Sequence, residues 1–253
     1  MSEKATVVAL SGKGGVGKTS LSAAIVRTLT EEKPDSRILA IDADPAVGLS
    51  VALGISVGET LDEVRQRVAA EVENGMSETQ DILAEAKYHL FDAITEERGF
   101  AFLAIGRPEA AGCYCAINTY LRQVISLLAD QFDYVVIDGE AGIEQINRRV
   151  MEKVTHLVLV SDQSRKGIEI IKTINKVSNE LVMADKSGVV LNRVMHPDLV
   201  KESDLGGIPL LAVIEPDEAL ALNDIEGTSV LDMTSESKVL KGAREVLEKL
   251  GVI

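Results

Sequence analysis

A segment near the start of the chain, 11–20, constrains the fold more than any other part of the 253-residue sequence. It reads Ser-Gly-Lys-Gly-Gly-Val-Gly-Lys-Thr-Ser. Four of its residues meet the pattern G-x-x-x-x-G-K-[ST]: Gly12, Gly17, Lys18 and Thr19. A short apolar run, 6–10, precedes the segment, and a helical pattern, 19–32, follows it. A glycine-rich turn between a strand and a helix N-terminus directs backbone N–H groups at an anion, which the helix dipole also favours. The segment therefore predicts a phosphate-binding loop in an α/β fold.

The loop contains the residue types that bind the phosphates of a nucleotide together with magnesium. We expect Lys18 to reach the β- and γ-phosphates and the Thr19 hydroxyl to coordinate Mg²⁺. The expected nucleotide-binding residues of the loop are Gly12, Lys13, Gly14, Gly15, Val16, Gly17, Lys18, Thr19 and Ser20. A glycine-rich turn that only matches the pattern is the alternative, and the flanking strand and helix patterns disfavour it.

Short apolar runs alternate with helical patterns along the rest of the chain. The expected strands cover 6–10, 37–41, 100–105, 133–137, 156–160, 188–191 and 209–214. The expected helices cover 19–32, 59–72, 78–92, 117–130, 142–152, 166–183 and 234–250. This alternation predicts an α/β fold with a doubly wound, mainly parallel sheet and helices on both faces. We expect a single domain over 1–253, in which the charged stretch 56–95 is an elaboration between the second and third strands.

The composition limits the partners and the location of the protein. Hydrophobic residues make up 46% of the sequence and aromatic residues only 3%, so small aliphatic side chains must fill the core. A net charge of −14 argues against nucleic acid and anionic membranes as partners. No apolar run reaches the roughly 20 residues of a membrane-spanning helix, and the N-terminus leads into a strand without a signal peptide. We therefore expect a soluble cytoplasmic protein.

Polar residues that follow the apolar strands should meet at one edge of the sheet, because ligands of open α/β sheets bind beyond the carboxyl ends of the strands. Asp138 follows the apolar run 135–137 and is expected to bind Mg²⁺, with a helix cap as the alternative. Asp42 and Asp44 follow the run 38–41, and a turn before the next proline is the alternative to a role in catalysis. A carboxylate beside a γ-phosphate is favourable only where Mg²⁺ and lysines neutralise the site.

The two cysteines of the chain, Cys113 and Cys115, are separated by one residue. In an extended segment such residues face the same way, and a helix N-terminus after them would favour the thiolate form. Two thiolates do not complete a tetrahedral metal site, which takes four ligands. Two buried thiols or a redox pair are the alternatives to a metal site. None of the three histidines, His89, His156 and His196, is expected to be a metal ligand.

The stretch Gly-Lys-Gly-Gly-Val-Gly-Lys-Thr, 12–19, resembles the deviant phosphate loop of the nitrogenase iron protein, MinD, ParA and CooC group of ATPases. The resemblance implies a nucleotide-sandwich homodimer in which Lys13 crosses the interface and contacts the partner's nucleotide. The stretch Asp-Ala-Asp-Pro, 42–45, resembles switch I of the same group, in which the aspartate before the proline orients the attacking water; Asp44 is its match. Together these resemblances imply Mg²⁺-dependent ATP hydrolysis, with Lys13, Lys18 and Asp44 as catalytic residues. The residues expected to hold magnesium are Thr19, Asp44 and Asp138.

Further likenesses to this group concern the base and a switch segment. The stretch 138–144 resembles switch II of CooC-type proteins. Asn192 resembles the residue that contacts adenine, and 214–217 resembles the loop that covers the base, so ATP is expected rather than GTP. The expected base contacts are Asn192, Arg193, Pro216 and Asp217. A turn cap is the alternative role for Asn192.

The run 112–115, which holds both cysteines, and the following Leu121-Arg122 resemble CooC-type ATPases, which mature nickel enzymes, notably carbon monoxide dehydrogenase. The related acetyl-CoA synthase maturation ATPase is equally compatible. In a twofold dimer, two Cys113/Cys115 pairs would supply four sulfur ligands for nickel, zinc or an iron–sulfur cluster. The expected function is a dimeric ATPase that assists metal insertion into a nickel-enzyme client.

Two other functions remain as alternatives. The first is an ATP-dependent iron–sulfur activator of a metalloenzyme, which would use the same cysteines. The second is a MinD- or ParA-like positioning ATPase. MinD-type proteins end in an amphipathic membrane helix, whereas we expect the apolar face of 238–250 to pack in the core, because its charges are balanced and it carries no bulky aromatic residue.

Overall fold

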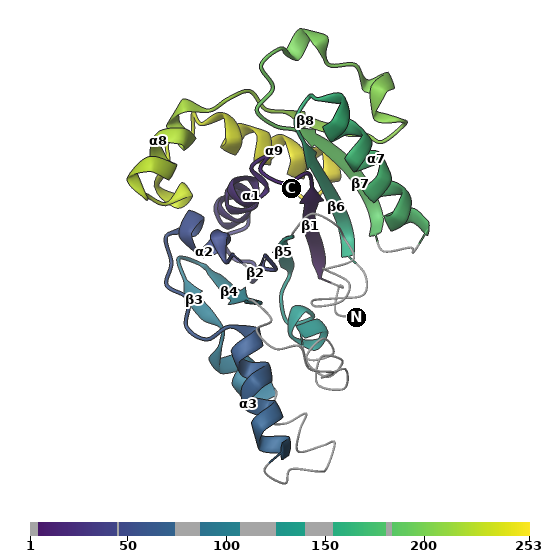
Figure 1. The fold of residues 1–253 in the computed structure, drawn as a ribbon. Helices are drawn as coiled ribbons and strands as arrows, with labels where there is room; N and C mark the ends of the chain where they lie inside the picture. The colour runs from purple at the N-terminus through teal and green to yellow at the C-terminus, as the bar shows by residue number, and fades with distance from the viewer. Residues whose placement is uncertain (1–4, 45, 74–86, 107–124, 140–153, 181–183) are drawn as a thin grey trace.

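The computed structural model describes residues 5–44, 46–73, 87–106, 125–139, 154–180 and 184–253. Within these ranges eight strands form one sheet in the order β3-β4-β2-β5-β1-β6-β7-β8. The strands are β1 (Thr6–Gly12), β2 (Ile38–Asp42), β3 (Thr95–Glu97), β4 (Phe100–Ala104), β5 (Tyr134–Asp138), β6 (Val154–Ser161), β7 (Ala184–Leu191) and β8 (Leu210–Val213). All neighbouring strands run parallel except β3 and β4. The predicted fold class, a doubly wound and mainly parallel α/β sheet, is confirmed (Figure 1).

Helices connect these strands. The α-helices are α1 (Lys18–Glu32), α2 (Gly48–Leu53), α3 (Leu61–Glu73), α7 (Arg165–Glu180), α8 (Glu218–Glu226) and α9 (Lys238–Leu250), and the 3₁₀ helices are η1 (Pro197–Leu199), η2 (Glu202–Leu205) and η3 (Val230–Asp232). Their ends follow local rules. At the start of α3, Thr60 and Glu63 form a capping box, since Glu63 Oε2 accepts from the Thr60 N–H (2.7 Å) and Thr60 Oγ1 accepts from the Glu63 N–H (3.3 Å). At the end of α9, Gly251 adopts the left-handed conformation with φ 73°.

The sheet separates two apolar cores. In β1, Val7 and Ala9 face one core, and Val8 and Leu10 face the other. α3 and α7 contribute to the first core, whereas α1, α2, α8 and α9 contribute to the second. Burial on both faces explains why the central strands are almost entirely apolar in sequence.

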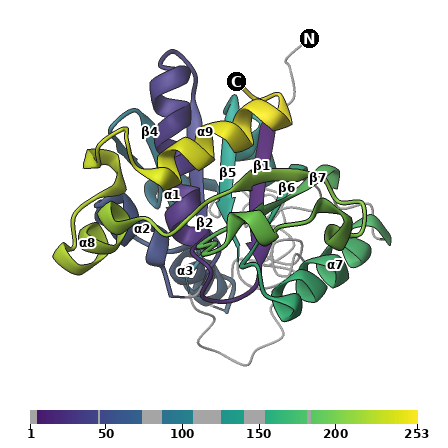
Figure 2. The same cartoon turned by 90° about the horizontal axis from the view of Figure 1, so that it is seen from above.

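The terminal helix α9 packs in the second core, as predicted. Its side chains Val239, Ala243, Val246 and Leu247 are each at most 1% exposed. α1 and α9 lie side by side in both views (Figures 1 and 2). The apolar face of this helix therefore covers the helix that begins at the phosphate loop.

Apart from the 3₁₀ helices, three described elements were not expected from the sequence: β3, α2 and α8. β3 reads Thr-Glu-Glu at the edge of the sheet and lacks an apolar pattern. It joins β4 through Arg98 and Gly99, whose φ angles of 50° and 87° give the two positive values that a two-residue hairpin turn requires. α2 and α8 have six and nine residues, too few for a helical apolar repeat to stand out.

Part of the expected helical structure lies outside the described residues. The expected helix 142–152 lies there entirely, and those at 78–92, 117–130 and 166–183 do so in part. Where the first two of these three are described, 87–92 and 125–129 include helical turns, and α7 covers the described part of the third.

The strand register brings the site residues to one edge of the sheet. Asp42 at the end of β2 is the register partner of Asp138 at the end of β5. Gly12 at the end of β1 is the register partner of Val160 in β6. The carboxyl ends of four adjacent strands thus meet where the chain enters the predicted phosphate loop, as expected for an open α/β sheet.

Candidate functional site

The predicted phosphate loop joins β1 to α1 through backbone conformations that glycine permits. Gly12 has φ 139°, and a Cβ there would lie 2.1 Å from the Val160 carbonyl oxygen. Gly17 has φ 88°, and a Cβ there would lie 2.8 Å from Asn192 Nδ2. Gly17 is the N-cap of α1, which has no side-chain cap and no acidic residue in its first turn. The N–H groups of that turn are therefore available to a phosphate.

The two lysines of the loop occupy different positions. Lys18 Nζ donates to the Lys13 carbonyl oxygen at 3.3 Å, within the loop. Lys13 Nζ instead forms a 2.5 Å ion pair with Oδ2 of Asp162, which follows β6. The two side chains are 28% and 32% exposed. Burial alone would raise the pKa of Asp162, but hydrogen bonds from Lys13 and Ser164 lower it below its ordinary value. From the sequence, 161–164 follow a strand and are among the polar strand-end residues that a nucleotide or magnesium could use, but Asp162 was not one of the predicted site residues.

Asp42 and Asp138 form a buried pair of carboxyl groups. Their exposed fractions are 0% and 1%. Burial, followed by the charge of Asp138, raises the pKa of Asp42 to about 7. Burial also raises the pKa of Asp138 to about 6, although the Thr19 and Ser22 hydroxyls and the Lys18 ammonium oppose it. Two like charges in this position require a cation for full ionisation.

The oxygens of this pair are unequally satisfied. Asp42 Oδ1 accepts from the Asp44 N–H (3.1 Å) and Oδ2 from the Leu49 N–H (2.8 Å). Asp138 Oδ1 accepts from the Ser22 hydroxyl (2.9 Å), whereas Oδ2 has no partner among the described residues. A buried carboxylate oxygen without a partner is costly, unless it is left for a ligand.

Oxygen donors from several elements fit Mg²⁺, which prefers carboxylate and hydroxyl oxygens. Thr19 and Asp138 are the residues that would hold the ion beside the phosphates. When bound, Mg²⁺ would neutralise phosphate charge and orient the γ-phosphate. Ser22 was missed by sequence reasoning. Its signal is its place one helical turn after Thr19, which puts both hydroxyls on the same face of α1.

Asp44 occupies a turn at the rim of the site. Its Oδ1 accepts from the Ala46 N–H at 2.9 Å, and the residue is partly exposed. This is the turn that an aspartate before a proline predicts. Pro45 lies outside the described residues, and the catalytic and magnesium roles of Asp44 stay predictions.

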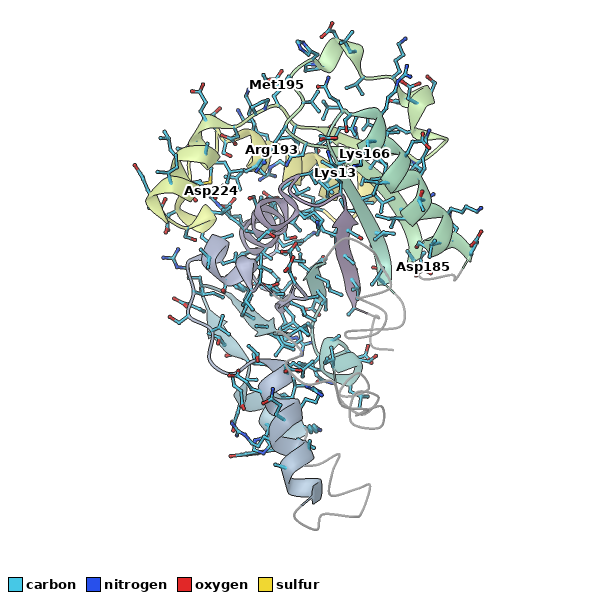
Figure 3. All side chains as sticks on the ribbon, viewed as in Figure 1. Lys13, Lys166, Asp185, Arg193, Met195 and Asp224 are labelled. Atoms are coloured by element: carbon cyan, nitrogen blue, oxygen red, sulfur yellow. The ribbon has the colours of Figure 1, made fainter. Side chains whose placement is uncertain are left out.

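A pocket of about 340 Å³ lies beside the phosphate loop. Its lining includes all four predicted base contacts: Asn192, Arg193, Pro216 and Asp217. Asn192 Nδ2 donates to the Val16 carbonyl oxygen (2.8 Å), and Arg193 Nη1 donates to the Gly15 carbonyl oxygen (3.2 Å). Figure 3 shows Lys13 and Arg193 at the end of the sheet where β1 leads into α1. The structure therefore brings the predicted base contacts and the phosphate loop together.

Asp217 fixes one wall of this pocket. Its Oδ1 caps α8 by accepting from the N–H groups of Ala219 and Leu220. Its Oδ2 accepts from the Ser237 hydroxyl (2.5 Å) and the Val239 N–H (3.0 Å), which lies in α9. Burial alone would raise the pKa of Asp217, but these hydrogen bonds lower it. The carboxylate joins α8 to α9 and so determines the position of the wall.

The predicted cysteine site and most of the predicted switch II lie outside the described residues. These are Cys113, Cys115 and 140–144. Among the residues that are described, no group of three or more His, Cys, Asp or Glu side chains is arranged to hold a metal ion. The metal role of Cys113 and Cys115 stays a prediction.

Comparisons with known proteins agree with a nucleotide-binding α/β fold. A family model described as the CobQ/CobB/MinD/ParA nucleotide binding domain matches residues 7–230. The chain is 32% identical over 253 residues to an uncharacterized ATP-binding protein of Methanocaldococcus jannaschii, covering 96% of this chain and 98% of that protein. It is 29% identical over 249 residues to the carbon monoxide dehydrogenase accessory protein CooC of Rhodospirillum rubrum, covering 90% of each. The septum site-determining protein MinD of Pyrococcus horikoshii, complexed with Mg-ADP, has the same fold, with a TM-score of 0.71 at 24% identity over 97% of this chain and 96% of that chain.

The chain belongs to the CobQ/CobB/MinD/ParA nucleotide-binding family. It is a P-loop ATPase of the MinD/ParA type, as the phosphate loop predicted. In the parts of the chain that the structure describes, no helix is both long and apolar enough to span a membrane.

We expect the substitution Asp138→Asn to raise the unfolding temperature of the protein without metal or nucleotide at about pH 8. The folded-state pKa of about 6 exceeds the ordinary value of 3.8, so the folded protein binds more protons than the unfolded chain between these values. Ionising this carboxyl in the folded protein therefore costs stability. The cost is complete above the folded-state pKa, shrinks on acidification and vanishes below about pH 4. Asparagine removes the charge and keeps an acceptor for Ser22.

Scanning fluorimetry at about pH 8 and about pH 4.5 measures this effect. The gain in unfolding temperature should be larger at the higher pH. Asp35→Asn, at an exposed aspartate, is the matched control and should change little at either pH. An Asp138→Asn variant that unfolds at a lower temperature than the unsubstituted protein at about pH 8 would show that the carboxylate is not under electrostatic stress.

Proposed function

We propose that this ATPase acts as a homodimer that assists the insertion of nickel, or a similar thiolate-binding metal, into carbon monoxide dehydrogenase or acetyl-CoA synthase. The observation that carries the proposal is the Cys113-x-Cys115 pair in a chain that also has Lys13 and a full phosphate loop. Likeness to CooC, a carbon monoxide dehydrogenase accessory protein, over 90% of both chains supports it. The proposed location is the cytoplasm.

The Lys13–Asp162 ion pair shows where Lys13 lies before two subunits meet in the proposed dimer. In the described chain Lys13 is held by its own subunit, 2.5 Å from Asp162. To contact the nucleotide of a partner, its ammonium has to leave Asp162. A partly exposed ion pair contributes about 0.2–1 kcal/mol, so the negative charge of ATP across the interface is sufficient to replace it. Dimerisation would then depend on bound nucleotide.

Hydrolysis would follow from the residues at the edge of the sheet. Lys18 and the N–H groups of α1 bind the phosphates, and Thr19 and Asp138 hold Mg²⁺. Asp44 orients a water whose oxygen attacks the γ-phosphorus, and the bond to the bridging oxygen of ADP breaks. The products are ADP, phosphate and a proton. Loss of the γ-phosphate removes contacts that favour the closed dimer, which can then reopen.

The metal is the cargo of this cycle. Each subunit would supply two thiolates, so the closed dimer would offer four sulfur ligands at its twofold axis. Opening after hydrolysis would halve the ligand set and allow transfer to the client enzyme. An iron–sulfur activator would use the same cysteines. A MinD-like membrane role is less well supported, because the apolar face of α9 is buried against α1.

Metal analysis of the double variant Cys113→Ser/Cys115→Ser tests the proposal. We expect the purified unsubstituted dimer to bind nickel or zinc under anaerobic conditions, and the double variant to lose it. His196→Ala, at an exposed histidine, is the control and should keep the metal. Iron and sulfide in equal amounts in the unsubstituted protein would favour the iron–sulfur activator. Metal retained by the double variant would contradict both functions.

Sedimentation velocity with a slowly hydrolysed ATP analogue tests the role of Lys13. Asp162→Asn removes the charge that holds Lys13 and keeps the Oδ1 acceptor for Ser164, so dimers should form at a few-fold lower protein concentration. Lys13→Ala should leave the protein monomeric. The control Asp198→Asn, in the exposed part of η1, should dimerise like the unsubstituted protein. Normal dimerisation of Lys13→Ala would refute an intersubunit role for this lysine.

A further inference from the structure

We call the pocket of about 340 Å³ that is lined by the four predicted base contacts the base pocket. The residues between it and α9 connect two parts of the site that are far apart in the sequence. We call 217–233, which contains α8 and η3, the linking segment. It starts at Asp217, in the wall of the base pocket. Asp217 Oδ1 caps α8, so the position of this helix is tied to the pocket wall.

At its other end the linking segment contacts α2. Asn223, which is 8% exposed, donates from Nδ2 to the Thr228 hydroxyl (2.7 Å) and to the Ser229 carbonyl oxygen (3.1 Å). Ser229, which is 6% exposed, donates from its hydroxyl to the carbonyl oxygen of Leu53, the last residue of α2 (2.7 Å). The approach is close, since a Cβ on Gly54 would lie 2.8 Å from Ser229 Cβ.

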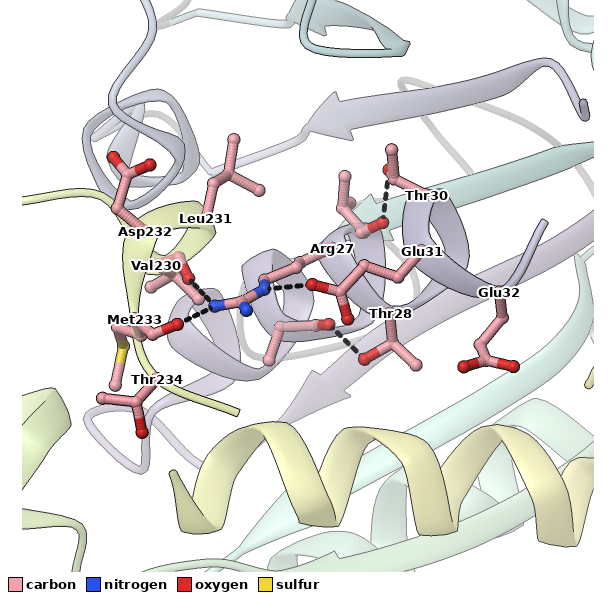
Figure 4. A network of polar contacts seen from close by, with 12 residues as sticks. Arg27, Thr28, Thr30, Glu31, Glu32, Val230, Leu231, Asp232, Met233 and Thr234 are labelled. Carbon is pink, nitrogen blue, oxygen red and sulfur yellow. Dashed lines mark hydrogen bonds and ion pairs between the residues drawn. The ribbon is translucent and has the colours of Figure 1, made fainter. Parts of the chain in front are cut away.

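The linking segment is also fixed to α1. Arg27 Nη1 donates to the carbonyl oxygens of Val230 (3.0 Å) and Met233 (2.6 Å), while its Nε donates to Glu31. Figure 4 shows this arginine reaching from α1 to the η3 turn. Because α1 begins at the phosphate loop, η3 is held against a fixed part of the site.

α2 in turn holds a carboxylate of the acidic pair. The N–H of Leu49, at the start of α2, donates to Asp42 Oδ2 (2.8 Å). The neighbouring Gly48 lies against Thr19, since a Cβ on Gly48 would be 3.5 Å from Thr19 Cγ2. α2 has only six residues, so a shift of its last turn moves its first turn as well.

We propose that the linking segment couples binding of a base in the base pocket to binding of Mg²⁺, with Ser229 as a positioning residue for Asp42. A base in the pocket would fix the wall at Asp217 and hence α8. The Asn223 and Ser229 hydrogen bonds would then fix α2, whose first turn orients Asp42 beside Asp138. Ser229 touches neither nucleotide nor metal in this scheme. The inference depends on Mg-nucleotide binding, and it is independent of nickel delivery and of dimerisation.

Titration calorimetry of Mg²⁺ into the full-length protein, saturated with ADP or with pyrophosphate, tests this inference. Pyrophosphate occupies the phosphate loop and leaves the base pocket empty. With ADP, Ser229→Ala should weaken Mg²⁺ binding about fivefold, the factor expected for one lost hydrogen bond. With pyrophosphate the two proteins should differ by less than about twofold, because no base then adds to the restraint on the linking segment.

Two further variants separate positioning from general damage. Ser178→Ala is the matched control, because this 1% exposed serine lies in α7, which packs against the face of the sheet opposite the linking segment. It should leave the Mg²⁺ dissociation constant unchanged. Asn223→Ala breaks the same connection at another bond and should reproduce the ADP-specific loss.

The comparison of Mg²⁺ dissociation constants with ADP and with pyrophosphate decides the outcome. Unfolding temperatures are measured in parallel to show that each variant is folded. An equal loss of Mg²⁺ affinity with ADP and pyrophosphate would overturn the coupling to the base pocket. Unchanged Mg²⁺ affinity in a folded Ser229→Ala variant would overturn the positioning role. If Ser229→Ala fails to fold, the same two criteria apply to Asn223→Ala.

Discussion

The site depends on two buried carboxyl groups that the sheet register forces together. Asp42 and Asp138 end adjacent parallel strands as register partners, at the edge where β1 enters the phosphate loop. Burial and mutual repulsion raise the pKa of Asp42, and burial raises that of Asp138. The fold thus contains a local destabilisation that a bound Mg²⁺ would relieve, in the way that any ligand of the folded state stabilises a protein. The phosphate loop, the hydroxyls of α1 and the start of α2 all act on this pair.

A second charge arrangement defines the state of the isolated subunit. Lys13 lies in the phosphate loop, but its ammonium pairs with Asp162 instead of extending away from the subunit. The pair is partly exposed, so its contribution is small and easily replaced by a nucleotide phosphate. A weak ion pair of this kind suits a lysine that changes partners when two subunits close. In the proposed dimer, the exchange of Asp162 for the partner's nucleotide would bring together the cysteine ligands of both subunits.

Much of this could be predicted from sequence, because the strongest signals are local. The strand, the glycines and the helix around Lys18 define the phosphate loop, and apolar runs define the central strands. The topology rule for parallel sheets then places Asp42 and Asp138 at the same edge. The sequence did not indicate β3, α2 or α8, because β3 is polar and the two helices are short. It also did not reveal three contacts between residues far apart in the sequence. Ser22 and Asp138 are 116 positions apart, Lys13 and Asp162 are 149 apart, and Leu53 and Ser229 are 176 apart.

Native mass spectrometry of the unsubstituted protein, with nickel and a slowly hydrolysed ATP analogue, tests the central claim most directly. The account predicts a dimer that carries two nucleotides and one nickel ion, and monomers without nickel once the nucleotide is removed. Nickel bound to monomers in the absence of nucleotide, or a nucleotide-bound dimer without nickel, would contradict it.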